Sequence, residues 1–101
     1  MTKKKIRLGL IQSFTSQDII KNFQLTTKKI EKAAAKGAQI ICLQELFKTV
    51  YFPQYDDMDA SEYAEPVPGS STGVLSNLAA NFSVVIIAPM YEKGPNGKYY
   101  N

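Results

Sequence analysis

The stretch Ala38-Gln39-Ile40-Ile41-Cys42-Leu43 decides the fold class of this chain. It is an almost uninterrupted apolar run, short and rich in residues that favour strands. Such a run, unlike an alternating one, predicts a strand covered on both faces, as in a parallel sheet. Gly37 stands directly before it and is expected to end a helix as a left-handed residue.

The residues before Gly37 complete a strand–helix–strand unit. Ile6–Ile11 alternates apolar residues with Arg7 and Gly9, which predicts a short strand. Asp18–Lys36 then takes helical spacing, with apolar residues on one stripe and lysines opposite. Thr15, Ser16 and Asp18 offer oxygens near its N-terminus. The stripe consists of Ile19, Phe23, Thr26/Thr27, Ile30 and Ala33/Ala34.

The residues after this unit predict a second helix and two further strands. Ser71 or Thr72 is expected to cap the helix, and Val84–Met90 reads as a third apolar strand. The turn residues Gly94–Gly97 then lead into a returning strand at Lys98–Asn101. The expected inner face of the helix is Val74, Leu75, Leu78, Ala79 and Phe82.

Composition excludes several classes of protein. The 101 residues suit one small domain, and no apolar run is long enough to span a bilayer. The single cysteine favours a reducing, cytoplasmic compartment, and the lack of histidine removes Ser-His and Cys-His pairs from this chain. The net charge of +3 comes from a basic N-terminal segment that begins at Lys3 and from lysines on the solvent-exposed face of the predicted helix. Because this is the pattern of a solvated surface, we expect neither nucleic acid nor membrane as partner. The acidic stretch 56–65 lacks the spacing of a calcium loop, and we expect no metal or cofactor.

The long segment Gln44–Gly69 has no clear periodicity, and we expect a functional loop with one helical turn near Asp59–Ala64. Its aromatic residues have two interpretations of equal weight. They either wall a ligand pocket or pack the loop onto the sheet. The group consists of Phe47, Tyr51, Phe52 and Tyr55.

Glu45 is the most informative candidate for chemistry, because it follows the buried run at the end of a predicted parallel strand. Ligands of open α/β sheets bind at the carboxyl ends of the strands. Apolar neighbours would partly desolvate this carboxylate and raise its pKa, which suits a general base. The alternative is an ordinary solvated acid at a strand exit. Cys42 lies inside the apolar run and reads as an inert core thiol rather than a nucleophile.

Several blocks of the chain together resemble the carbon-nitrogen hydrolase (nitrilase) superfamily. Gly37–Phe47 resembles its first catalytic block, and the similarity runs colinearly over essentially the whole chain. Three motifs, QELF at Gln44–Phe47, YFPQ at Tyr51–Gln54 and AEPVPG at Ala64–Gly69, most resemble the N-carbamoylputrescine amidase branch.

This resemblance implies a fold and a reaction. The fold is an α-β-β-α sandwich of class α/β, of which residues 1–101 would be the N-terminal part, about the first third of a single domain. The reaction is hydrolysis of a small linear carbamoyl amine or amide by a Glu-Lys-Cys triad, with Glu45 as general base and Tyr51 as a pocket-wall residue touching substrate. The complete protein would be a homo-oligomer.

The family's lysine and nucleophilic cysteine lie in later blocks, and Lys93, Lys98 and Cys42 stand in the wrong context to replace them. This chain alone is therefore expected to be inactive. The alternative function is a non-catalytic remnant or interaction module that retains half of the fold. Two helices cover one face of a sheet, so we also expect an exposed apolar face rich in Ile, Leu and Val.

Overall fold

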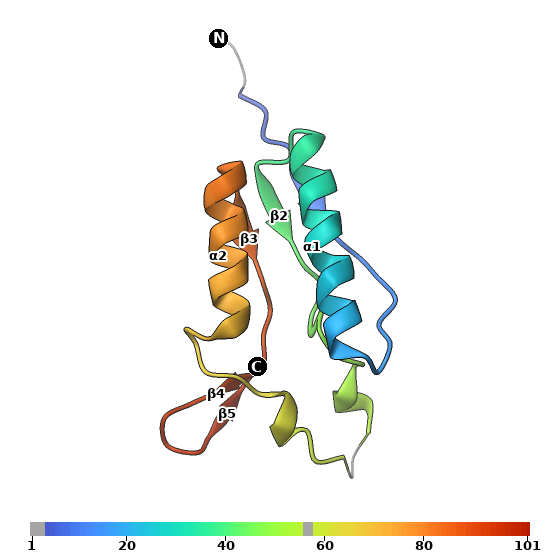
Figure 1. Cartoon of the computed structure of the whole chain (residues 1–101), viewed down its shortest axis with the longest axis vertical. Coiled ribbons are helices and arrows are strands. Elements are labelled where there is room, and N and C mark those ends of the chain that lie inside the picture. Colours follow the sequence, from blue (N-terminus) through green and yellow to red (C-terminus); the bar gives the residue numbers. More distant parts are fainter. Residues whose placement is uncertain (1–3, 56–57) are drawn as a thin grey trace.

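The computed structural model describes residues 4–55 and 58–101 (Figure 1). Lys3 of the basic start and Asp56 and Asp57 of the acidic stretch lie outside the described residues. Two helices, several short strands and two 3₁₀ turns follow one another along the chain. In order they are β1 (Leu8–Leu10), α1 (Ile19–Ala35), β2 (Ile40–Cys42), η1 (Phe52–Gln54), η2 (Ser61–Tyr63), α2 (Ser70–Phe82), β3 (Val85–Ile87), β4 (Glu92–Lys93) and β5 (Tyr99–Tyr100).

The main sheet is parallel, as predicted, with the strand order β1-β2-β3. Ile40 of β2 is in register with Leu8 of β1 and with Val85 of β3. The prediction that the run at 38–43 is covered on both faces is wrong, because Ile40 and Cys42 of β2 are only half-buried. In the described sheet β1 and β3 are the outer strands, and their outward residues are exposed, with Leu10 79% and Ile87 50% accessible.

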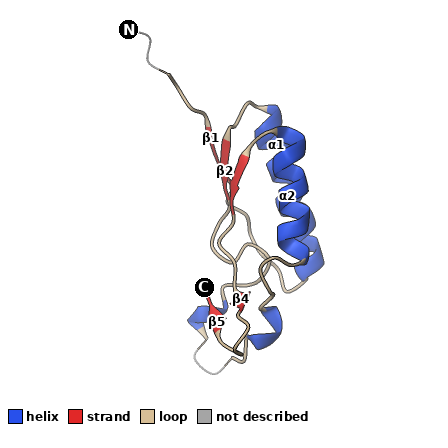
Figure 2. Ribbon diagram, turned by 90° about the vertical axis from the view of Figure 1, so that its left-hand side faces the viewer, coloured by secondary structure: helices blue, strands red, loops and turns tan. Residues whose placement is uncertain are grey.

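Both helices cover the same face of this sheet (Figure 2). Ile41 and Ile30 are fully buried between the two layers, where Leu75 of α2 joins them. On the opposite face nothing in the described chain covers Leu8, Leu10, Val85 and Ile87, since alternation along each strand turns their side chains away from the helices. The expected exposed apolar face is therefore present.

Helix α1 agrees with the prediction to within one residue at each end. Asp18 caps it by accepting a hydrogen bond from the backbone N–H of Lys21 at 3.1 Å. Gly37 has φ of 91°, the left-handed conformation in which glycine avoids a Cβ clash. Asn22 is a buried polar residue that the apolar stripe did not predict. Its Oδ1 accepts a hydrogen bond from the Ser16 N–H, and its Nδ2 donates to the backbone carbonyls of Ser16 and Lys48.

Helix α2 begins at Ser70, before either predicted cap, and Gly69 is the N-cap residue. The Thr72 hydroxyl, inside the first turn, accepts from the Gly69 N–H at 2.6 Å and donates to the Gly69 carbonyl at 3.0 Å. Leu75 is buried as predicted. Val74 and Phe82 are exposed, however, because no further layer of the described chain packs beside this helix.

The predicted turn and returning strand form a small hairpin in which β4 and β5 pair antiparallel. The Gly94 N–H donates to the Lys98 carbonyl at 2.7 Å, and Gly97 takes a positive φ of 70°. The third strand is shorter than the predicted Val84–Met90. Of the described residues, no helix is both long and apolar enough to cross a membrane.

Candidate active site

Glu45 follows the middle strand of the parallel sheet at its carboxyl end, as predicted. The expected partial desolvation is wrong, since the Glu45 side chain is exposed, as in the alternative of a solvated acid at a strand exit. The chain turns sharply at Leu46, whose φ is 55°. Leu46 and Phe47 take the interior positions, at 5% and 3% accessibility, and the carboxylate is left at the surface. The Glu45 carboxylate is therefore accessible from solvent at the carboxyl end of β2.

Asn101 is the residue that contacts this carboxylate. Its Nδ2 donates a hydrogen bond to Glu45 Oε1 at 2.7 Å. Asn101 directly follows β5, which ends at Tyr100, so the hairpin of β4 and β5 places Asn101 beside Glu45. One oxygen of Glu45 is thus oriented by a neutral donor contributed from the other end of the chain.

The aromatic residues of the long loop divide between the two interpretations. Phe47 packs against Phe23, with ring centroids 6.0 Å apart. Phe52 packs against Tyr63 and Tyr91, with ring centroids 5.7 and 5.0 Å apart, respectively. Phe47 therefore fastens the loop to the main core, whereas Phe52 packs in a separate small cluster with Leu46 and Ala60.

Tyr51 and Tyr55 are exposed instead, with 48% of Tyr51 accessible. Tyr51 precedes the first turn of η1, on the same loop as Glu45. The role of Tyr51 in touching substrate stays a prediction. The expected helical turn of this loop is confirmed by η2, whereas η1 was not predicted.

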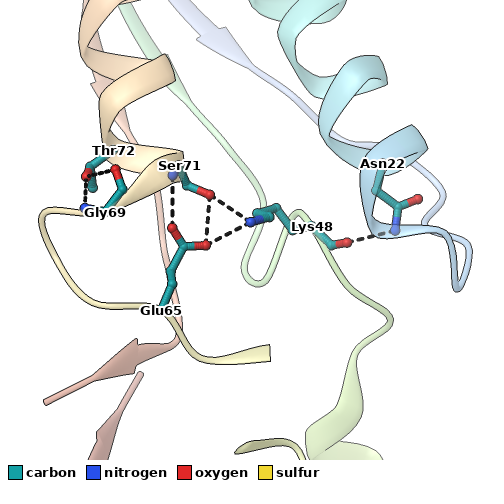
Figure 3. Close-up of polar contacts among 6 residues, drawn as sticks. All are labelled: Asn22, Lys48, Glu65, Gly69, Ser71 and Thr72. Atoms are coloured by element: carbon teal, nitrogen blue, oxygen red, sulfur yellow. Dashed lines mark hydrogen bonds and ion pairs between the residues drawn. The ribbon is translucent and has the colours of Figure 1, made fainter. Parts of the chain in front are cut away.

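Lys48 lies at the centre of a polar cluster that sequence reasoning missed (Figure 3). Its Nζ donates to Glu65 Oε2 and to the Ser71 hydroxyl, both at 2.8 Å. Ser71 in turn donates its backbone N–H to Glu65 Oε1 at 3.0 Å and its hydroxyl to Oε2 at 2.8 Å. The only local signal for this cluster was a lone cation within an apolar and aromatic stretch.

The environment of Glu65 keeps this carboxylate ionised. Burial by itself raises the pKa of Glu65, but the hydrogen bonds from Lys48 and Ser71 and the positive charge of Lys48 outweigh it. The net result is a pKa below the ordinary value of 4.5. Glu65 is therefore an acceptor and charge partner at neutral pH rather than a proton donor.

Cys42 is half-buried, on the sheet face opposite the fully buried Ile41. The expectation that it lies inside the core is therefore wrong, because the face on which it stands is the one without helices. Its Sγ is 3.6 Å from the Leu43 carbonyl. In residues 4–55 and 58–101, no three acidic or thiol side chains gather as metal ligands would.

Comparison with known proteins decides the family. The sequence model of the carbon-nitrogen hydrolase family, described as "Carbon-nitrogen hydrolase", matches residues 7–101. The chain belongs to the carbon-nitrogen hydrolase family. A crystal structure of a carbon-nitrogen hydrolase from Helicobacter pylori G27 superimposes with a TM-score of 0.79 at 31% identity, covering 95% of this chain and 33% of that one. The α/β fold predicted from the resemblance is confirmed.

Curated relatives of this carbon-nitrogen hydrolase chain are amidases. Omega-amidase NIT2-B from Xenopus laevis is 38% identical over 96% of the chain and 34% of its own length. Omega-amidase NIT2 from Homo sapiens is 37% identical over 94% of the chain. N-carbamoylputrescine amidase from Solanum lycopersicum is 33% identical over 93% of the chain and 32% of its own length. The chain therefore spans about a third of the length of these relatives, and the similarity does not single out the N-carbamoylputrescine branch.

Proposed function

We propose that this chain is the N-terminal part of an amidase that hydrolyses a terminal C–N bond of a small linear substrate, with Glu45 as general base. The observation that carries the proposal is the exposed Glu45 carboxylate at the carboxyl end of the middle parallel strand, oriented by Asn101. Family membership over residues 7–101 supports the reaction class.

The proposed reaction uses Glu45 with a lysine and a cysteine that would come from outside residues 1–101. Glu45 takes the thiol proton, and the thiolate attacks the carbonyl carbon to give a tetrahedral intermediate that the lysine stabilises. Collapse of this intermediate breaks the C–N bond as Glu45 gives the proton to the leaving nitrogen, which departs as ammonia and leaves an acyl group on sulfur. Water then hydrolyses the thioester and regenerates the thiol.

Two substrate classes are proposed, in order. The first is a linear acid with a terminal carboxamide, supported by the omega-amidase relatives at 37–38% identity. The second is N-carbamoylputrescine, supported by the tomato relative and by the motifs at 44–47, 51–54 and 64–69. In either case we propose Tyr51 as a wall of the substrate pocket. A homo-oligomer in the cytoplasm is the proposed setting of the complete protein.

The test is Glu45→Gln in the complete polypeptide, with ammonia release measured from glutaramate and from N-carbamoylputrescine. The amide keeps the shape of the side chain but cannot accept the thiol proton, so kcat should fall by about 10²–10⁴-fold with folding unchanged. Glu31→Gln, at an exposed carboxylate of α1, is the control and should keep full activity.

Near-wild-type turnover by Glu45→Gln would show that the proposed base is wrong. If the folded complete polypeptide released ammonia from neither substrate, the non-catalytic interaction module would be the better description.

A further inference from the structure

The turn that carries Glu45 needs an external support. Leu46 adopts a left-handed conformation, with φ of 55°, which residues other than glycine, asparagine and aspartate rarely take. The Thr49 N–H donates to the Leu46 carbonyl at 3.2 Å, which closes the turn but does not attach it to the rest of the fold. Burial of Leu46 and Phe47 holds the turn on its inner side.

Lys48 attaches this turn to three other segments. Its backbone carbonyl accepts from Asn22 Nδ2 of α1 at 2.8 Å. Its Nζ reaches Glu65 and Ser71 at 2.8 Å (Figure 3). The same atom lies 5.4 Å from the centre of the Phe23 ring. Both ends of one residue, three positions after Glu45, are therefore fixed to the starts of α1 and α2.

The partner Glu65 is itself held from two sides. Its carboxylate receives the backbone N–H and hydroxyl of Ser71, at the first turn of α2. Its backbone N–H donates to the Tyr91 carbonyl at 3.1 Å, and its carbonyl accepts from the Lys93 N–H at 2.8 Å. Tyr91 and Lys93 begin the hairpin that delivers Asn101 to Glu45. Lys48 and Glu65 thus connect the segment that bears Glu45 with the segment that bears its hydrogen-bond partner.

The pair is sheltered enough to be rigid. The side chains of Lys48 and Glu65 are 24% and 14% accessible. Charge-assisted hydrogen bonds in such surroundings are short and directional. Loss of either partner leaves the other charge half-buried and without compensation, so the cost is greater than at the open surface.

We infer that Lys48 is a positioning residue for Glu45, acting through Glu65 and Ser71; this inference rests on the proposed function. Lys48 does not touch substrate. It fixes the turn at Leu46 so that the Glu45 carboxylate meets the incoming thiol at the correct distance. Displacement of a reacting group by about 1 Å costs up to about 10²-fold in rate, which sets the expected size of the effect.

The experiment measures kcat and KM per folded molecule, with thermal unfolding, for Lys48→Met in the complete polypeptide. Methionine keeps the length of the side chain and removes its charge and donors. We expect kcat to fall by about 10- to 100-fold with KM nearly unchanged, and Lys48→Arg to recover most of the loss. Lys29→Met is the matched control, because Lys29 Nζ bonds only to a carbonyl in the part of the chain described, that of Gln12 at 3.0 Å. Its kcat should equal that of the wild type.

The double variant Lys48→Met/Glu65→Gln separates a linked pair from two independent residues. A linked pair loses no more activity in the double variant than in Lys48→Met. If the double variant shows the product of the two single-variant losses in kcat, the inference is overturned. An unchanged kcat per folded Lys48→Met molecule would overturn it too, because a purely structural role changes only the folded fraction.

Two further results keep the inference distinct from the proposed function. An active Glu45→Gln variant rejects the proposed function, and with it the inference. A normal kcat for Lys48→Met beside an inactive Glu45→Gln rejects the inference alone. If Lys48→Met does not fold, Ser71→Ala replaces it. That variant keeps the ion pair but removes the hydroxyl that accepts from Lys48 and donates to Glu65, and an unchanged kcat would reject the inference equally.

Discussion

Asn101 and Glu45, 56 positions apart in the sequence, are joined by a hydrogen bond of 2.7 Å from Asn101 Nδ2 to Glu45 Oε1. The bond unites the hairpin of β4 and β5 with the carboxyl end of β2. A neutral amide donor restricts rotation of the carboxylate without adding a charge to it. Asn101 therefore belongs to the candidate site beside Glu45, which the strand end predicted, and Tyr51, which the family resemblance implied.

Asn101→Ala in the complete polypeptide should lower kcat by about two- to tenfold, because a single hydrogen bond contributes about 0.5–1.5 kcal/mol. The measurement is ammonia release at saturating substrate. Asn96→Ala, at the turn of the same hairpin, removes an identical side chain away from Glu45 and should leave kcat unchanged. Equal rates for the two variants would mean that the bond does not orient the base.

The isolated 101-residue chain should release no ammonia from glutaramate or N-carbamoylputrescine. Glu45 can accept a proton, but by the proposed mechanism the chain lacks the attacking thiol and the stabilising lysine. The control is the complete polypeptide under the same conditions. Turnover by the isolated chain that disappears in Cys42→Ala would make the half-buried Cys42 a nucleophile and contradict this prediction.

Glu65 should make the complete protein sensitive to acid. Its pKa is lowered in the folded state, so the unfolded state binds more protons as the pH falls through the ordinary value of 4.5. The contribution of ionised Glu65 to the free energy of unfolding is complete above about pH 4.5 and is lost as the pH falls through the lower pKa of the folded state. Between pH 7 and pH 3, the melting temperature of Glu65→Gln should therefore fall by less than that of the wild type. Glu31→Gln, on the open surface of α1, should follow the wild-type curve, and parallel curves for all three proteins would refute the prediction.

The uncovered sheet face should make the isolated chain self-associate. Leu8 and Leu10 of β1 and Val85 and Ile87 of β3 flank β2 on the uncovered face, and apolar surfaces of this kind recruit other chains. Static light scattering at micromolar concentration should show large species, and near-UV circular dichroism a weak signal. The double variant Leu10→Lys/Ile87→Lys should scatter less than Ile20→Lys, which alters an exposed apolar residue of α1 instead. A monodisperse wild-type monomer with a sharp thermal transition would show a self-sufficient domain.

The elements with local signals were predictable from the sequence. Asp18 and Gly37 delimit α1 through their own backbone and side-chain chemistry, so its ends were placed within one residue. The apolar run at 38–43 correctly indicated a parallel strand, and the turn at 94–97 a hairpin. The position of Glu45 at a strand end followed from the same run.

The contacts between distant segments were not predictable in this way. Lys48 and Glu65 are 17 positions apart, and neither lies in a periodic segment that would assign it a partner. The prediction of which apolar residues are buried was partly wrong for a related reason. An apolar pattern indicates which residues prefer an interior, and Val74, Phe82 and Ile87 are exposed because no layer of the described chain covers them. Glu45 is exposed because the sharp turn at the left-handed Leu46 places the side chains of Leu46 and Phe47 in the interior instead.

The strand order β1-β2-β3 has a consequence for synthesis on the ribosome. Each strand lies beside the one translated immediately before it, so the spatial order of the sheet is the order of translation. At about 5–20 residues per second, roughly 4–16 s separate the appearance of β1 and β3. During this interval every new strand finds its hydrogen-bonding neighbour already made, and the layer grows in one direction without waiting for a distant segment.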